Sequence, residues 1–425
     1  MSENKGVSPV AAFFRSLGPA IIVASVVLGP GSILSASKVG TQHGYSMIWV
    51  LVVAGILMTG MTAMAARLGV SFEGSLCDEL CARLGRPFAV VVGATIFGIA
   101  TCFQFSNNLG VLAGIEPLME SGFSKTAQVI VLVALNGIII GVLIGLKSLY
   151  RPIEKLMMLM MGLMLIGFAA NLLFAKPSVA GIAGGFVPRL PSGAGGMADL
   201  LPLLAMVATT FSIAGAYYQA YLVREKGWTT ANLKQGLVDS VAGITALVGI
   251  TLIILTTAAA VLHGKIKVEE LKSAADVALQ LKPAFGSAAV ILFAQGILAG
   301  AFSSFLVNAM IGGTMLADGL GLGSRLDEKW PKRFTVASLL VGMGIALLIK
   351  TSGVSIVGLI IFAQALTVLG GPVLAFSMMY LATRKEMTGE RRMPGWIMTI
   401  GWFACVVTVA MAVKKAADIW TKIQG

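Results

Sequence analysis

The stretch of sequence that decides the fold is residues 17–39, LGPAIIVASVVLGPGSILSASKV. It is apolar and long enough to be a membrane helix, yet Gly29-Pro30-Gly31-Ser32 interrupts it near its middle. Two glycines and a proline remove helix propensity and one backbone donor at membrane depth. Because irregular backbone inside a bilayer is tolerated only where it lines a cavity or a site, we expect a substrate to bind at this break.

The composition is that of a polytopic membrane protein. Of the 425 residues, 57% are hydrophobic and only 12% are charged. The net charge of +12 does not indicate a nucleic-acid partner, because Lys and Arg concentrate in loops on one predicted side of the membrane. The four cysteines show neither disulfide nor zinc spacing. We therefore expect the lipid bilayer as surroundings, no cofactor and no metal site.

Eleven apolar stretches predict membrane spans, at roughly 17–39, 46–68, 88–110, 125–146, 153–174, 200–223, 236–262, 287–316, 334–350, 355–380 and 394–415. The distribution of Lys and Arg predicts a cytoplasmic N-terminus and an extracytoplasmic C-terminus. Residues 1–15 lack a cleavable signal pattern, so the first span is expected to insert uncleaved in the cell membrane. The whole chain, 1–425, is predicted to be one transmembrane domain.

The sixth span carries a second interruption, Ser212-Ile213-Ala214-Gly215-Ala216. Spans one and six lie five apart, which is the spacing of two inverted five-helix repeats whose first helices are both broken. Residues 17–174 would form the first repeat and 200–380 the second, with 394–415 as an extra helix. The predicted fold is therefore an all-α membrane protein of this architecture.

Several short motifs resemble the NRAMP family of proton-coupled divalent-metal transporters, which have the leucine-transporter-type fold. They are Gly40 with Gly44-Tyr45-Ser46 and Trp49, then 66–70 (ARLGV), 186–191 (FVPRLP), Leu222-Val223, and 293–294 with 300–304 (GAFSS). Their order and spacing match that family over nearly the whole chain. The resemblance implies the fold predicted above and a transport function.

The positions that carry the family's chemistry differ in this chain. In metal-transporting members the first break reads Asp-Pro-Gly-Asn, and its Asp and Asn bind the metal; here Gly29 and Ser32 stand there. The family's Met-Pro-His in the sixth helix corresponds to Ser212, Ile213 and Ala214. Where the family has a second histidine in the sixth helix, this chain has Gln219. The family's acidic residues in the third helix, which are linked to proton movement, fall at about Thr95, Cys102 and Phe105 here.

A site of this kind favours an anion over a dication. Desolvating a divalent ion without a counter-charge costs several kcal/mol. In contrast, the helix beginning at Ser32 offers backbone N–H groups and a positive dipole end, and Gly31 allows close approach. Ser212 would supply a matching half. The predicted substrate-binding residues are Gly29, Gly31, Ser32, Lys38, Thr209, Thr210, Ser212 and Ala214.

Other polar residues have two interpretations each. Lys38 either attracts an entering anion or extends to the outer interface. Gln104, Asn107, Asn108 and Gln219 either line the pathway or bond between helices, and packing is the preferred interpretation for Asn308 and Gln364. Carbonyls at Thr209 and Thr210 are candidates for holding a coupled cation. Asp239 is expected at a solvated or ion-paired helix end.

The preferred hypothesis is a monomeric secondary transporter of a small anion, bicarbonate or a short carboxylate, coupled to H⁺ or Na⁺. A divalent-metal transporter for Mg²⁺ or Mn²⁺ with an altered site is the alternative. A carrier of a neutral or zwitterionic solute and a membrane sensor stay open as further hypotheses. An enzyme is not expected, because the sequence contains no nucleophile–base pair or phosphate-binding loop.

Overall fold

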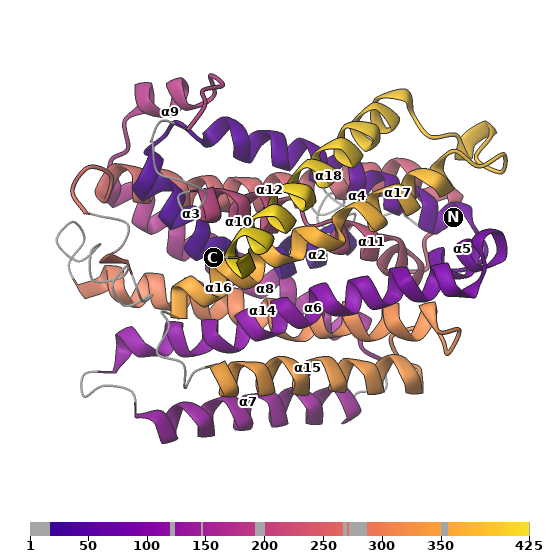
Figure 1. The fold of residues 1–425 in the computed structure, drawn as a ribbon, viewed down its shortest axis with the longest axis horizontal. Helices are drawn as coiled ribbons and strands as arrows, with labels where there is room; N and C mark the ends of the chain where they lie inside the picture. The colour runs from indigo at the N-terminus through magenta and orange to yellow at the C-terminus, as the bar shows by residue number, and fades with distance from the viewer. Residues whose placement is uncertain are drawn as a thin grey trace, which may run out of the picture.

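The computed structural model describes residues 18–119, 124–145, 148–191, 200–266, 270–271, 287–349 and 356–424. Within these ranges the regular structure is helical, without strands. Figure 1 shows most of the long helices running roughly parallel to the longest axis of the molecule. The helices are α2 (Pro19–Val27), α3 (Pro30–His43), α4 (Ile48–Ser71), α5 (Leu76–Leu84), α6 (Arg86–Ile115), α7 (Lys125–Gly145), α8 (Tyr150–Ala175), α9 (Val179–Gly185), α10 (Leu201–Thr210), α11 (Ile213–Glu225), α12 (Leu233–Val261), α14 (Ser287–Gly319), α15 (Lys329–Ile349), α16 (Ile356–Leu366), α17 (Gly371–Ala382) and α18 (Gly395–Gln424).

The described helices include ten that are long and apolar enough to cross a membrane, and eleven when α2 and α3 count as one broken span. This agrees with the eleven spans predicted from the sequence. The axes of α2 and α3 differ by 59° at their break. The second predicted break separates α10 from α11 at Phe211 and Ser212, but Leu201–Glu225 still counts as a single span of 25 residues.

A third interruption was not predicted. The tenth span consists of α16 and α17, joined by a 3₁₀ turn (η6) over Thr367–Gly370. The sequence Gly370-Gly371-Pro372 explains it, since glycine weakens a helix and proline removes a backbone donor. The same composition signal occurs at the first break.

Helix contacts come in pairs that relate the two halves of the chain. The second half-helix of the first span, α3, packs on α12, and its counterpart α11 packs on α4. Likewise α2 packs on α8, and α10 packs on α16. These pairs match the elements of the first repeat to those of the second, as two inverted repeats require. The predicted architecture is confirmed, with α18 as the additional helix.

Helices α6 and α14 run side by side (Figure 1), and closely packed glycines lie between them. A Cβ atom built on Gly93 would lie 2.5 Å from the Met315 carbonyl oxygen. A Cβ on Gly319 would lie 2.6 Å from the Ala89 carbonyl oxygen. Small residues at such crossings let two backbones approach closely, which is how membrane helices gain packing energy.

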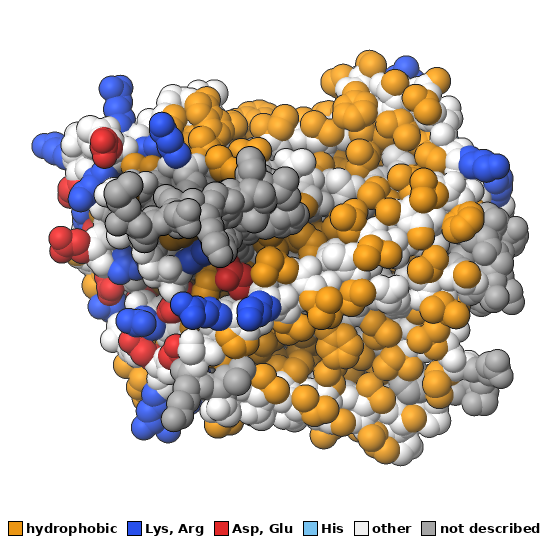
Figure 2. All heavy atoms as spheres, turned by 180° about the vertical axis from the view of Figure 1, so that it is seen from behind, with side chains coloured by type: hydrophobic (Ala, Val, Ile, Leu, Met, Phe, Trp, Pro, Cys, Tyr) orange, Lys and Arg blue, Asp and Glu red, His pale blue; other side chains and the backbone are white. Residues whose placement is uncertain are grey.

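The surface divides into an apolar belt and charged ends. Large apolar side chains on α7 and α8 are exposed, among them Ile138 (65%) and Ile166 (67%), as expected for helices that face lipid. Figure 2 shows most Lys, Arg, Asp and Glu side chains gathered at one end of the molecule. This is the end that carries α5 and the start of α2 in Figure 1.

The glycine crossing generates a stability prediction. We expect Gly93→Ala to lower the melting temperature of the purified protein, with a loss of about 1–3 kcal/mol typical of overpacking. Gly137→Ala on α7 is the matched control, because a Cβ there meets nothing within 4 Å. Thermal unfolding followed by tryptophan fluorescence measures both. Equal melting temperatures for the two variants would contradict the close α6–α14 packing.

Candidate functional site

The first helix break is fully enclosed by the protein. Gly29 is the N-cap of α3 and has an extended backbone, with φ −81° and ψ −179°. Pro30 follows at the first helical position, where its missing N–H costs nothing and its fixed φ suits a helix start. Ser32 has no exposed surface. The break is thus a sharp, buried turn between two half-helices.

The start of α3 leaves few backbone donors unpaired. Ser32 N–H bonds back to the Gly29 carbonyl oxygen at 3.0 Å, and Pro30 has no N–H. The Gly31 N–H has no partner among the described residues. The Ser32 hydroxyl is also buried and without a hydrogen-bond partner in the described part of the chain. One amide and one hydroxyl therefore remain as donors at the positive end of this helix.

The second break repeats this arrangement with a different cap. Ser212 is the N-cap of α11, and its hydroxyl oxygen accepts a hydrogen bond from Gly215 N–H at 3.3 Å. The hydroxyl proton of Ser212 stays available for donation. No described group accepts from the N–H of Ile213 or Ala214. The N-terminal end of α11 is thus a second cluster of donors.

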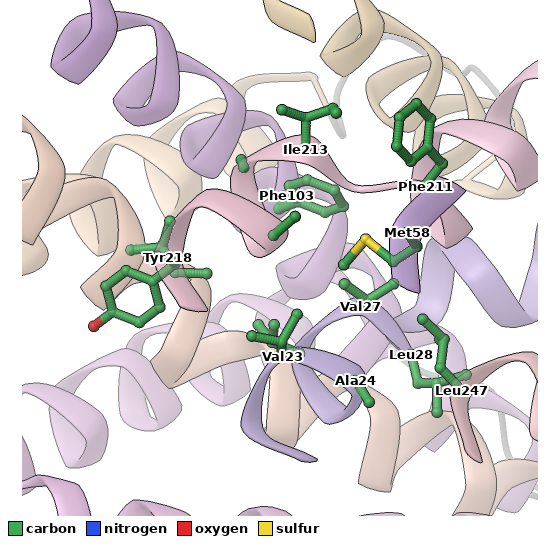
Figure 3. Close-up of a cluster of buried hydrophobic side chains, with 14 of the residues drawn as sticks. Val23, Ala24, Val27, Leu28, Met58, Phe103, Phe211, Ile213, Tyr218 and Leu247 are labelled. Carbon is green, nitrogen blue, oxygen red and sulfur yellow. The ribbon is translucent and has the colours of Figure 1, made fainter. Parts of the chain in front are cut away.

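Helix packing brings the two breaks together. α10 lies along α3, and α11 lies against α2. A Cβ on Gly215 would lie 3.4 Å from side-chain atoms of both Val23 and Val27. Figure 3 shows Phe211 after the end of α10 and Ile213 at the start of α11, with Phe103, Met58 and Val27 nearby. The donor groups are therefore surrounded by apolar side chains.

A small pocket adjoins the second break. Ser212 and Ala214 line it together with apolar side chains from α6 and α18, and with the hydroxyl-bearing residues Thr367 and Thr408. Ser212 and Ala214 are only 6% and 5% exposed, respectively. The site is consequently almost closed, with hydroxyl groups as its polar lining.

The third break lies against the first one. The Gln364 side chain, on the last turn of α16, occupies the space beside Gly31 where any larger residue would place its Cβ. Gln364 Nε2 donates to the Ser106 hydroxyl at 2.8 Å, and its Oε1 has no described partner. The Gln364–Ser106 bond between α16 and α6 agrees with the packing role expected for Gln364. The contact with Gly31 was not expected, and the Gly-Gly-Pro run six residues later signals only the break in the helix.

Asn107 is the pathway candidate that reaches the first break. Its Oδ1 lies 3.3 Å from the position that a Cβ of Gly29 would take. Its Nδ2 donates to Gln104 Oε1 at 3.2 Å, and Gln104 Nε2 in turn donates to the Phe305 carbonyl. Asn108 instead accepts from Asn136 of α7 at 2.9 Å. Gln104 and Asn108 thus bond between helices, while Asn107 faces the site.

Thr209, Thr210 and Lys38, three of the predicted substrate-binding residues, differ in burial and in hydrogen-bond partners. The Thr209 hydroxyl donates to carbonyls of Ala205 and Met206, both at 3.0 Å and both in its own helix. The Thr210 hydroxyl is buried and unpartnered within the described residues. Lys38 is partly buried on α3, two turns beyond Gly31. Of these two threonines, only Thr210 has a hydroxyl without a described partner; the prediction that their carbonyls hold a cation stays a prediction.

Asp239 differs from the sequence expectation of a solvated or ion-paired helix end. It is fully buried on α12 and accepts hydrogen bonds from the N–H groups of Gly18 and Ala20, both at 2.8 Å. Gln219 Nε2 donates to the same carboxylate at 3.1 Å. Asp239 therefore caps the N-terminal end of α2, and Gln219 belongs to this cap rather than to the break.

The described residues contain no group of three or more His, Cys, Asp or Glu side chains that could hold a metal ion. The oxygen atoms nearest the first break come from amides, hydroxyls and backbone carbonyls. Such groups are neutral, so they offer dipoles but no full negative charge.

Known proteins resemble this chain over most of its length. A divalent metal cation transporter (MntH) of Deinococcus radiodurans is 25% identical over 407 residues, covering 93% of this chain and 88% of that protein. A divalent metal cation transporter (MntH) of Xylella fastidiosa is 24% identical over 418 residues, with 95% and 84% coverage.

Solved structures share the same fold. The manganese transporter of Eremococcus coleocola superposes with a TM-score of 0.80 at 16% identity, covering 100% of this chain and 90% of that one. MhsT, solved in complex with L-phenylalanine, gives a TM-score of 0.60 at 16% identity, with 93% and 98% coverage. The family model described as natural resistance-associated macrophage protein-like matches residues 20–418. The chain therefore belongs to the Nramp family of secondary transporters.

Proposed function

We propose that this transporter carries a small monovalent oxyanion, bicarbonate or a short carboxylate, by alternating access with H⁺ or Na⁺ as the coupling ion. The observation that carries the proposal is the start of α3, where the buried Gly31 N–H and Ser32 hydroxyl have no described partner. A helix N-terminus with free donors is a favourable place for negative charge. The family's carboxylate position is Gly29 here, so no negative side chain opposes the anion.

The start of α11 supports the same substrate class. Its Ile213 and Ala214 N–H groups and the Ser212 hydroxyl proton add donors beside the first break. A planar oxyanion has several acceptor oxygens, and two helix N-termini can satisfy them together. Helix dipoles carry only about half a positive charge each, so a monovalent anion suits them better than a dianion.

Transport of a divalent metal cation is the second candidate, and the names of the related proteins favour it. The acceptors near the first break include Asn107 Oδ1, Gln364 Oε1 and the Ser304 hydroxyl, and all of these oxygens are neutral. Removing a dication from water into such a pocket leaves its charge uncompensated, at a cost of several kcal/mol even after relaxation. This electrostatic cost is why we rank the anion first.

The charge distribution supports a cytoplasmic N-terminus as part of the proposal. The Lys- and Arg-rich end of Figure 2 is the end at which α2 begins. Arg83 and Arg86 lie there, and Arg83 pairs with Glu386 at 2.9 Å. Positively charged loops are retained on the cytoplasmic side during insertion. α2 would then be the inner half and α3 the outer half of the first span.

A substitution that introduces a negative charge tests the anion site. Ser32→Asp should abolish bicarbonate uptake, because it places a carboxylate at the end of α3 where the substrate's charge would lie. Ser32→Ala should reduce uptake by roughly tenfold, the effect of losing one hydrogen bond to a charged group. Proteoliposomes with an internal pH dye measure bicarbonate transport, and a metal-sensitive dye measures Mn²⁺ or Mg²⁺ in parallel.

Two results would overturn the proposal. One is metal influx through the unmodified protein with no response to any oxyanion. The other is normal anion uptake by Ser32→Asp, which would place the substrate elsewhere in the chain.

Lys38 is tested by its effect on apparent affinity. If it attracts the entering anion, Lys38→Gln should raise KM by roughly tenfold at low ionic strength with little change in kcat, and added salt should shrink the difference. Lys176→Gln, an exposed lysine at the end of α8, is the matched control. Unchanged KM in Lys38→Gln would leave Lys38 as an interfacial residue.

A further inference from the structure

An apolar groove runs where α2, α8 and α12 pack against one another. Its volume is about 410 Å³, and each of the ten residues that line it is either apolar or glycine. Met158 and Leu165 in its lining are 39% and 47% exposed, so the groove opens on the side of α8 that faces lipid. It is therefore a feature of the lipid-facing surface, distinct from the enclosed site at the helix breaks.

Two glycines keep this groove open. Gly162 on α8 and Gly249 on α12 both line it, and a Cβ on either would meet nothing within 4 Å. The missing side chains thus leave space that the described part of the chain does not fill. An empty void would forfeit dispersion contacts, and water would find no hydrogen-bond partner on apolar walls. A lipid acyl chain meets neither penalty.

The groove has the length of one lipid leaflet. On α12 its lining runs from Ala242 to Ile253, which is about 16 Å at roughly 1.5 Å per residue. Half of a hydrocarbon core of ~30 Å is nearly the same length. A helix from a second copy of the protein is too large, because a cylinder about 10 Å wide and 16 Å long occupies roughly 1,200 Å³. The observed 410 Å³ suits a single extended chain instead.

One end of the groove meets positive charge. Arg151 and Lys155 precede Met158 by two turns and one turn on the same side of α8. Both are exposed, and neither forms an ion pair with a described residue. The nearby carboxylate of Glu154 is already paired with Lys226, at 3.0 Å. Two cations at the start of α8 are therefore left for an anionic group.

The Glu154–Lys226 pair marks this end of the groove. A Cβ on Gly18 would lie 2.1 Å from both Glu154 Oε1 and Lys226 Nζ, so the pair lies directly over the start of α2. Ile21, one turn into α2, lines the groove just beyond it. The start of α2 is at the end of the molecule where Lys and Arg gather (Figure 2). The groove thus leads from a charged boundary into an apolar interior, which is the polarity of a phospholipid.

We propose that this groove binds one anionic phospholipid, with an acyl chain along Gly162 and Gly249 and the headgroup at Arg151 and Lys155. Each Lys or Arg near a membrane surface strengthens the attraction to acidic lipid by roughly fivefold. The acyl chain contacts α2 through Ile21, so the bound lipid ties the first half-helix to α8 and α12. This inference does not depend on which ion the protein transports.

Lipid binding is tested on the purified protein in a neutral detergent. Dioleoyl phosphatidylglycerol and dioleoyl phosphatidylcholine, which have the same acyl chains, are titrated in parallel while thermal unfolding is followed. The acidic lipid should raise the melting temperature in a saturable way and at the lower concentration. Native mass spectrometry should show one retained phosphatidylglycerol per protein.

Two sets of variants separate the acyl-chain part from the headgroup part. Gly162→Leu and Gly249→Leu should each fill the groove and remove the saturable stabilisation, whereas Gly137→Leu on α7, where a Cβ also meets nothing within 4 Å, should keep it.

Combining Arg151→Gln with Lys155→Gln should raise the half-saturating phosphatidylglycerol concentration to that of phosphatidylcholine. Lys385→Gln is the matched control, because this exposed lysine lies at the same end of the molecule, next to the Glu386 that pairs with Arg83.

Each variant is compared with its own melting temperature without added lipid, so a general loss of stability does not imitate a lost site. Equal stabilisation of the unmodified protein by the two lipids would overturn the anionic-lipid site, as would undiminished stabilisation in both leucine variants. A dimer of the unmodified protein that Gly162→Leu dissociates would assign the groove to a second copy and overturn the proposal as well.

Discussion

The structure depends on one constraint: backbone groups freed by breaking a helix inside a membrane must find partners or bind a ligand. Each end of α2 meets it with side chains of the second repeat. Asp239 accepts from the first N–H groups of α2, and the serines of α14 donate to its last carbonyls. The start of α3 is treated differently, since Gly31 and Ser32 keep donors without described partners. The Gly31 N–H and the Ser32 hydroxyl thus remain available to a ligand at this end of α3.

The same constraint explains why the fold alone does not identify the substrate. A TM-score of 0.80 at 16% identity shows that the backbone arrangement survives extensive change of side chains. Broken helices need only glycine, proline and partners for the backbone groups at their ends, and these requirements say little about the substrate. The side chains at the break determine which substrate can bind. Gly29 and Ser32 keep the turn while supplying no carboxylate, so membership of the family alone does not define the transported ion.

Much of this could be predicted from the sequence, and what could not has a physical reason. Hydropathy located every span, and Gly29-Pro30-Gly31 located the first break, because both signals are local in the chain. The cap by Asp239 and the contact of Gln364 with Gly31 join residues hundreds of positions apart, and one sequence carries no signal for such pairs. The turn after Gln364 shows the limit: its Gly-Gly-Pro run is visible, but its position beside Gly31 is not.

The two ends of the first break have opposite electrostatic character, and this has a consequence for energetics. The C-terminus of α2 presents carbonyls, whereas the N-terminus of α3 presents donors, and only Gly29 with its neighbours separates them. An ion bound alone at either end is stabilised by dipoles but carries its full charge in a medium of low dielectric. A cation bound close to an anion makes the pair neutral overall, so each ion lowers the desolvation cost of the other. Under the proposed function, a coupled cation would therefore strengthen binding of the anion at the start of α3, and the anion would strengthen binding of the cation by the same factor.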